Sequence, residues 1–457
     1  MEWLTVLPPV AALVVAVWTR NVYWSLGLAI WLSETLVAGF NPAMGALGSI
    51  DRAVGVFGSE GNTRILLFCL IIGALIVYMQ RSGGIAAMVE RLHSTGLAST
   101  PRRAGLVTAL SGVIIFVETN VSLLATGVLG RPLFDRLKVS RARLAYIIDS
   151  TCSPICVLVL LNGWGAYLLS LMMANGVESP VPVLFQTIAL NFYALLTIAG
   201  VFATIMLNRT FGAMATADAN WTSPVGLAEG IPDSDTSVTP SRAVYMGLPM
   251  LILVGGALAF MIWTGEGDIT KGSGSQSILW AVVLATAAAF AFLAFSQRAK
   301  GELVSIGFQG MGDLLPAVTV IFMALVLGDS LRALGTGDFI AGVAATIPAP
   351  WAIPAILFVV AGVTSFTTGT SWGTYGILVP IAIPLAMGAG IPLPLVMAAV
   401  IGGGVFGDHC SPISDTTIIA SLAAGCDHIE HVKTQLPYAL AAGGAATLLY
   451  VIAALVA

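Results

Sequence analysis

Apolar runs of helix length follow one another through the whole chain. The hydrocarbon core of a bilayer is about 30 Å thick, and a helix needs about 20 apolar residues to cross it. Of the 457 residues, 57% are hydrophobic and only 9% are charged, whereas soluble proteins carry about 25% charged residues. We therefore predict a polytopic membrane protein. The expected spans are residues 2–19, 22–40, 64–80, 104–130, 144–174, 181–207, 243–264, 276–296, 310–328, 352–388, 393–424 and 436–456.

The length of these runs also predicts their secondary structure. Backbone groups in lipid must bond within the protein, so only helices and closed barrels span membranes. Barrel strands are roughly ten residues long and these runs are longer, which indicates an all-α polytopic membrane protein. The composition excludes a disordered chain and a nucleic-acid binder with a basic face. No CxxC pair, nucleophile–base pairing or metal-ligand spacing is present, so we expect neither an enzyme nor a bound cofactor.

Two halves of the chain share motifs in the same order. Cys152-Ser153-Pro154-Ile155 recurs as Cys410-Ser411-Pro412-Ile413, and Phe116 precedes one polar segment as Phe366 precedes another. Each Ser-Pro pair predicts a helix start inside an apolar segment, because serine is a good N-cap and proline suits the first helical position. The half-helices meeting there would offer carbonyls and hydroxyls to a dehydrated cation. A plain proline kink, which membrane helices tolerate, is the alternative.

Basic residues indicate how these segments cross the membrane. The arginine-rich loops 81–103 and 131–143 should both face the cytoplasm, so segment 104–130 must leave on the side it entered, as a re-entrant hairpin. Opposite orientations of the two halves predict two inverted-topology repeats with discontinuous helices and two re-entrant hairpins, the pattern of secondary transporters. The expected units are N-terminal scaffold helices (1–62), a first repeat (63–207) with hairpin 104–130 and broken helix 144–174, a polar linker (208–242), central scaffold helices (243–309), and a second repeat (310–457) with hairpin 352–388 and broken helix 393–424.

Four acidic residues lie in or beside apolar segments, namely Glu118, Asp149, Asp408 and Asp415. A charge at the bilayer centre costs at least a few kcal/mol, so such residues usually face a cavity, an ion or a proton. His409 is the only basic residue within these motifs. An acidic site without a matching Lys or Arg favours a cationic cargo. The alternative for Asp149 is an interfacial position near the basic loop.

Oxygen-bearing side chains surround these acids in the sequence. Sodium, as a hard cation, prefers oxygen ligands, and a carboxylate that binds either Na⁺ or H⁺ suffices for exchange. His409 is either proton-linked or a neutral packing residue, while His428 and His431 are expected on a solvated loop. The candidate ion- or substrate-binding residues are Asp408, Asp415, Ser411, Thr416, Thr370, Ser371, Glu118, Asn120, Asp149 and Ser153; the sodium-site candidates among them are Asp408, Ser411, Asp415, Asp149 and Asn120.

Two of these motifs resemble those of a known family. The run from Gly407 to Thr417, GDHCSPISDTT, resembles the hallmark of the NhaC family of Na⁺/H⁺ antiporters, and Thr370-Ser371-Trp372-Gly373-Thr374 resembles a second motif. The resemblance covers roughly residues 60–457. It implies an elevator-type transporter, in which a transport domain moves against a scaffold, and a homodimer. It carries functional roles onto Asp408, Ser411, Pro412, Asp415 and Thr416, and next onto Thr370 and Ser371.

Two transport functions stay open at this point. The first is exchange of Na⁺ for H⁺ by a multi-pass protein of the cell (inner) membrane. The second is sodium- or proton-coupled transport of a small organic solute, an amino acid or a carboxylate, through the same ion sites. An organic anion would need an exposed half-helix N-terminus or an Arg in the site; helix N-termini are expected at Pro154 and Pro412, but no convincing core Arg is present. An ion channel fits less well, because no ring-forming selectivity motif is found. The expected partners are the lipid bilayer, Na⁺, H⁺, the organic solute and a second copy of the chain, without nucleic acid.

Overall fold

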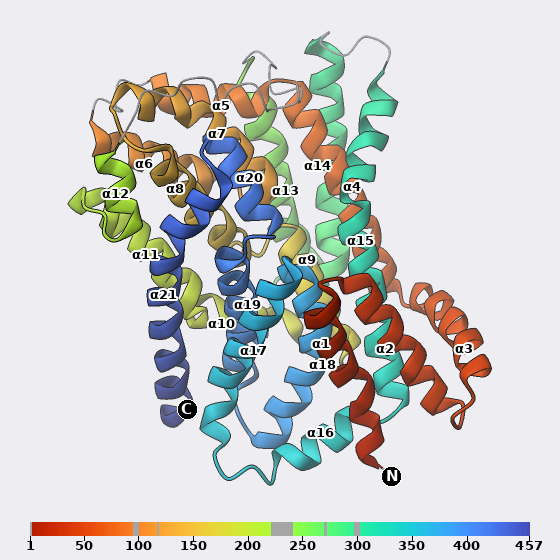
Figure 1. Ribbon diagram of the computed structural model, residues 1–457. Coiled ribbons are helices and arrows are strands. Elements are labelled where there is room, and N and C mark those ends of the chain that lie inside the picture. The colour runs from red at the N-terminus through yellow and green to blue at the C-terminus, as the bar shows by residue number, and fades with distance from the viewer. Residues whose placement is uncertain (1, 95–99, 117, 221–240, 269–271, 297–301) are drawn as a thin grey trace.

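The chain folds into a bundle of helices (Figure 1). The computed structural model describes residues 2–94, 100–116, 118–220, 241–268, 272–296 and 302–457. Within these ranges it contains helices and no strands. Eight helices are long and apolar enough to cross a membrane, or up to 11 spans if each bent pair counts as one. The predicted all-helical, multi-span class is thus confirmed.

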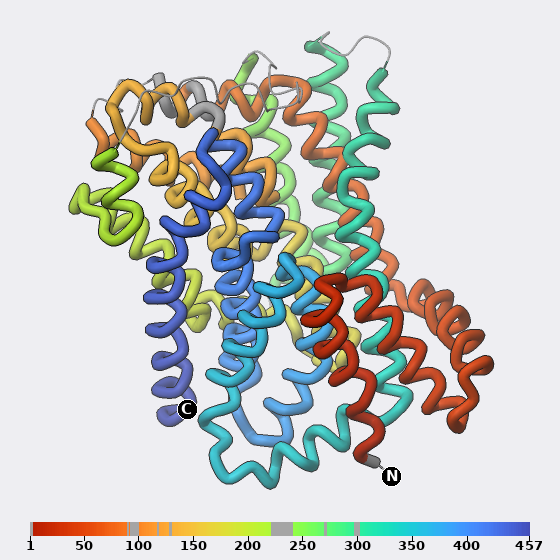
Figure 2. The backbone as a smooth tube through the Cα atoms, in the orientation of Figure 1, coloured from red at the N-terminus to blue at the C-terminus, as the bar shows by residue number. Residues whose placement is uncertain are grey.

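Two helical hairpins approach the middle of the molecule from opposite ends (Figures 1 and 2). The first consists of α6 (Pro101–Ile114) and α7 (Thr119–Arg136), and the second of α17 (Ile353–Thr368) and α18 (Ser371–Ala389). Residues from both turns line one cavity, so the two tips lie close together. The predicted hairpin segments 104–130 and 352–388 correspond to these pairs, although each pair extends beyond its predicted bounds.

Two interrupted helices pass beside the hairpin tips. The first is α8 (Arg141–Leu158) followed by α9 (Gly163–Ala174), with a bend of 44°. The second is α19 (Leu393–Cys410) followed by α20 (Asp415–Ala424).

The predicted helix starts at the two Ser-Pro pairs are wrong. Helix α8 continues through Pro154, as membrane helices can. Helix α8 ends at Leu158, and the next helix, α9, is capped by Asn162. The Asn162 side chain accepts hydrogen bonds from the backbone N–H groups of Trp164 and Gly165. In the second interruption Ser411 ends α19, and α20 begins only at Asp415.

The other helices frame this centre. Helix α4 (Glu60–Arg81) packs along α15 (Leu303–Ala333) and α14 (Gly274–Ser296), and α14 packs on α13 (Val244–Thr264). Helices α4 and α15 meet at Gly73 and Gly310, where a methyl group on either glycine would collide with the carbonyl of the other. Small residues at such crossings let membrane helices approach closely. The remaining helices are α1 (Leu7–Thr19), α2 (Val22–Val37), α3 (Pro42–Gly55), α5 (Gly84–Ser94), α10 (Pro180–Leu190), α11 (Phe192–Leu207), α12 (Ala213–Ala219), α16 (Thr336–Ala344) and α21 (His428–Val456), with 3₁₀ turns at Glu2–Val6, Val56–Gly58 and Pro350–Ala352.

Several of these boundaries differ from the sequence prediction. Helix α3 was not expected; it turns back from α2 by 114°. The predicted linker 208–242 contains the short helix α12, and its residues 221–240 lie outside the described part of the chain. Helix α21 begins at His428 rather than 436, which moves two histidines from a predicted loop into a helix.

Candidate ion and substrate site

Asp408 lies in the last turn of α19 and is only 3% exposed. The hydroxyl of Ser414 donates to its Oδ1 at 2.6 Å, and the hydroxyl of Ser371 donates to its Oδ2 at 3.2 Å. Thr416 extends this shell, because its Oγ1 lies 2.9 Å from the Ser414 Oγ. Among the described residues, no ion pair links Asp408 to Lys, Arg or His. A buried carboxylate surrounded by hydroxyl oxygens can accept a small cation or a proton.

Each helix interruption is attached to a hairpin through a phenylalanine carbonyl. Ser411 donates from its hydroxyl to the Phe366 carbonyl at 2.7 Å. In the other half of the chain, the Asn162 amide donates to the Phe116 carbonyl at 2.9 Å. Ser411, predicted as a sodium ligand, therefore has its hydroxyl proton directed to the hairpin. The two halves use different residues for an equivalent attachment.

The C-terminal end of α20 is held by two arginines from the first half of the chain. Arg131 donates to the carbonyls of Leu422 and Ala423, the latter at 2.7 Å, and Arg141 donates to the Gly425 carbonyl at 3.0 Å. Cations at a helix C-terminus also interact favourably with the helix dipole. Helix α20 is therefore fixed to the first hairpin although it follows the second.

A cavity of about 450 Å³ lies between the two hairpin tips. Four predicted site residues line it: Glu118 and Asn120 from the first tip, Thr370 from the second, and Asp415 from the start of α20. The Glu118 and Asp415 carboxylates are close enough to repel each other, and the Asn120 amide approaches Asp415. The Asn120 Oδ1 is buried without a hydrogen-bond partner among the described residues. Two carboxyl groups therefore face the cavity from the hairpin side.

Helix N-termini converge on the same cavity. Those of α2, α7, α9, α18 and α20 all supply lining residues. Glu118 caps α7 by accepting from the Val121 N–H at 2.7 Å, whereas no side chain caps α18 at Thr370 or α20 at Ser414. Helix N-termini carry partial positive charge. This charge partly balances the carboxylates and also makes the site receptive to an anionic group.

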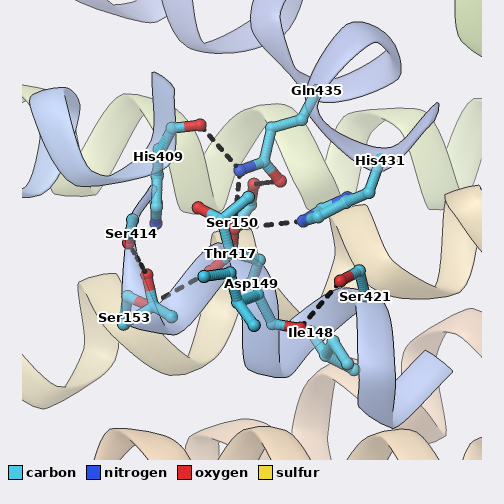
Figure 3. Close-up of polar contacts among 12 residues, drawn as sticks. Ile148, Asp149, Ser150, Ser153, His409, Ser414, Thr417, Ser421, His431 and Gln435 are labelled. Atoms are coloured by element: carbon cyan, nitrogen blue, oxygen red, sulfur yellow. Dashed lines mark hydrogen bonds and ion pairs between the residues drawn. The ribbon is translucent and has the colours of Figure 1, made fainter. Parts of the chain in front are cut away.

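Asp149 lies in a second buried cluster, beneath α21 (Figure 3). The Gln435 amide donates to its Oδ2 at 2.6 Å, and the His431 Nε2 lies 3.4 Å from the same oxygen. The Ser153 hydroxyl donates to Oδ1 at 3.4 Å. Asp149, Ser153 and their partners are therefore brought together as an ion-binding cluster would require. The Asp149 side chain is fully buried within the protein.

His409 joins the two buried clusters. It follows Asp408 in the chain, its carbonyl accepts a bond from the Gln435 amide at 3.0 Å, and its Nδ1 lies 3.0 Å from the Tyr193 hydroxyl. Its Nε2 is buried without a partner among the described residues.

Sequence reasoning missed His431 and Gln435. His431 was expected on a solvated loop, which is wrong: its side chain is fully buried. The charged residues near the start of α21 lowered the local hydropathy and hid the helix. The available signal was the spacing of four residues, which places His431 and Gln435 on one helix face. Arg20 and Asp313, which also line the cavity, were missed because no local motif marks them.

Comparison with known proteins agrees with this architecture. A family model described as "Na+/H+ antiporter family" matches residues 155–455. An uncharacterized protein of Haemophilus influenzae is 31% identical over 98% of this chain and 90% of its own length. The malate-2H⁺/Na⁺-lactate antiporter of Bacillus subtilis is 44% identical over 78 residues, 17% of each chain. The YdaH transporter of Alcanivorax borkumensis has a similar fold, with a TM-score of 0.55 at 15% identity, covering 89% of this chain and 88% of that one.

Proposed function

The chain belongs to the Na⁺/H⁺ antiporter family, and from this premise we propose that it exchanges Na⁺ for H⁺ across the cell (inner) membrane by competition at buried carboxylates. The family consists of secondary transporters rather than enzymes, without a cofactor, and Na⁺ and H⁺ are its transported ions. Membership of the family does not identify the residues of this chain at which the two ions compete.

The observation that carries the proposal is the environment of Asp408. A dehydrated Na⁺ would bind its carboxylate together with the oxygens of Ser371 and Ser414, whose hydroxyl protons now point at that carboxylate. A proton on the same carboxyl would turn it into a donor to one of these hydroxyls. One buried site that holds either ion, but not both, is the minimum requirement for exchange.

Asp415, Glu118 and Asn120 form the approach to this site. They line the cavity next to Asp408, and the Asp415 and Asp408 carboxylates are close enough to interact. We propose that they attract and partly dehydrate the incoming cation. Asp149 is a second, weaker candidate, because Gln435, Ser153 and His431 already satisfy its carboxylate.

We further propose that the hairpins and interrupted helices are two inverted repeats that move together as an elevator, in a homodimer. The approach of the hairpins from opposite ends supports this, as do the paired attachments to Phe116 and Phe366. Cross-links between the scaffold and hairpin tips that block transport, and light scattering of the purified protein, would test the movement and the dimer.

A second function, coupled transport of an organic solute, is favoured by one observation. The cavity of about 450 Å³ is far larger than one dehydrated ion requires, since a water molecule occupies about 30 Å³ in the liquid.

The direct test is ion exchange in proteoliposomes containing a pH-sensitive dye. Wild-type protein should move protons when Na⁺ alone is added, whereas Asp408→Asn should not. Asp51→Asn, a substitution of an exposed acid in α3, is the matched control and should behave as wild type. Normal Na⁺-driven proton movement by Asp408→Asn would reject this site.

A further inference from the structure

The central cavity has the size of a small-molecule site. Its volume of about 450 Å³ falls within the range of about 300–1,000 Å³ that is usual for ligand pockets. The ion ligands at Asp408 lie in the adjoining helix interruption, so an ion bound there would leave most of this volume to water or to another solute.

Opposite charges line different sides of the cavity. Glu118 and Asp415 come from the hairpin side, while Arg20 comes from the turn between α1 and α2. Among the described residues, no hydrogen bond or ion pair involves the Arg20 guanidinium, and Asp313, which also lines the cavity, does not pair with it. Arg20 is exposed where the turn between α1 and α2 meets the cavity, so its guanidinium is accessible to a carboxylate, which it can bind through two hydrogen bonds.

Part of the remaining wall is aromatic, and most of the rest is aliphatic. Trp372, two residues beyond the second hairpin tip, lies against Trp164 at a centroid distance of 4.0 Å and stacks on Tyr167 at 5.1 Å. The Tyr167 hydroxyl donates to the Trp372 carbonyl at 2.8 Å. Both tryptophans line the cavity. This wall offers a rigid apolar surface between the acidic and basic sides.

From this arrangement we infer that the cavity binds an α-amino acid with an apolar side chain, its ammonium group at Glu118 and Asp415, its carboxylate at Arg20 and its side chain against Trp164 and Trp372. The inference rests on the proposed function, since the amino acid is carried together with the ions. The uncapped N-terminus of α18 at Thr370 offers the carboxylate a second favourable environment.

A solute with one charge uses one side of the cavity. A simple carboxylate such as lactate could bind Arg20 and would leave Glu118 and Asp415 to the coupling cation. A simple amine would use the acids and leave Arg20 unpaired. A solute that carries both charges matches both sides of the cavity.

Binding to the purified full-length protein by calorimetry in Na⁺ buffer tests this match. The probes are L-leucine, 4-methylpentanoate, which lacks the ammonium group, and isopentylamine, which lacks the carboxylate; L-phenylalanine with 3-phenylpropionate and phenethylamine forms a second series. We expect each amino acid to bind at least tenfold more tightly than both of its analogues. Equal binding within both series, or no binding of either amino acid, would overturn the inference.

Variants of Arg20 locate the carboxylate. Arg20→Gln should remove the advantage of L-leucine over isopentylamine, Arg20→Lys should retain most of it, and Arg209→Gln, at an exposed position after α11, should leave it unchanged. An unaltered advantage in Arg20→Gln would exclude Arg20 as the carboxylate partner. If this variant does not fold, the wild-type probe series still tests whether the cavity binds an amino acid.

Transport measurements separate this inference from the proposed function. Proteoliposomes should accumulate radiolabelled L-leucine in response to a Na⁺ gradient. Proton movement with Na⁺ alone, without binding of either amino acid, would overturn the inference and leave Na⁺/H⁺ exchange intact. Na⁺-driven leucine uptake by Asp408→Asn would reject the Asp408 ion site and retain the amino-acid site.

Discussion

Removing the Ser414 hydroxyl should weaken Na⁺ binding more than removing the Ser371 hydroxyl. Both hydroxyls donate to Asp408, but Ser414 does so at 2.6 Å and Ser371 at 3.2 Å. When Na⁺ binds, these hydroxyls would contact it through their oxygens, and we take the loss of one oxygen ligand to cost about as much as a hydrogen bond to a charged group, about 1.5–3 kcal/mol. About 1.4 kcal/mol corresponds to a tenfold change in affinity. We therefore expect Ser414→Ala to raise the KM for Na⁺ about 10- to 100-fold, and Ser371→Ala to raise it about tenfold or less.

The assay is initial-rate uptake of ²²Na⁺ into proteoliposomes with an outward proton gradient, at several external Na⁺ concentrations. Ser414→Thr keeps the hydroxyl and should retain near-normal affinity. Ser170→Ala removes a buried hydroxyl of α9 that donates to the Tyr167 carbonyl and not to Asp408, and serves as the control for general loss of stability.

Proton competition adds a second check on the same experiment. If H⁺ and Na⁺ share Asp408, raising the external pH by one unit removes competing protons and should lower the apparent KM for Na⁺ up to tenfold until protons no longer occupy the site. An unchanged KM in Ser414→Ala, or equal effects of the two alanine variants, would refute the ranking drawn from the distances. A KM independent of pH would refute competition at a shared site.

Two further changes probe the parts that support the site. Gln435→Leu removes the amide that donates to Asp149 and to the His409 carbonyl. Losing these two bonds to buried acceptors should cost about 1–3 kcal/mol each and lower the thermal midpoint in detergent, which an unchanged midpoint would contradict. Arg131→Gln removes the hydrogen bonds to the carbonyls of Leu422 and Ala423. Amide hydrogen exchange should therefore accelerate in α20 and remain as in wild type in α4. Equal acceleration in both helices would indicate global destabilisation instead.

The class of the protein and part of its site could be predicted from the sequence because they depend on local composition. The lack of charge indicates membrane helices, and an acid among serines and threonines in an apolar segment indicates a buried carboxylate with hydroxyl partners, as the structure has at Asp408. Ser371 lies 37 residues before Asp408, yet its hairpin motif marked it as a candidate. No sequence motif identified Arg20 as a candidate. It reaches the cavity because α2 packs on α15 and α1 on α18, which no pattern near residue 20 reveals.

The repeated tetrapeptide shows where local reasoning stops. In α8 the Thr151 hydroxyl bonds back to the Ile147 carbonyl and the helix continues through Ser153 and Pro154. In α19 the Ser411 hydroxyl instead accepts from the Ile413 N–H and donates to Phe366, and such side-chain bonds compete with helix formation. The Phe366 carbonyl that accepts from Ser411 corresponds to the Phe116 carbonyl of the first hairpin. The Phe116 carbonyl accepts from the Asn162 amide. Both halves therefore attach an interruption to a hairpin, and tertiary contact, rather than the shared sequence, decides at which residue the helix ends.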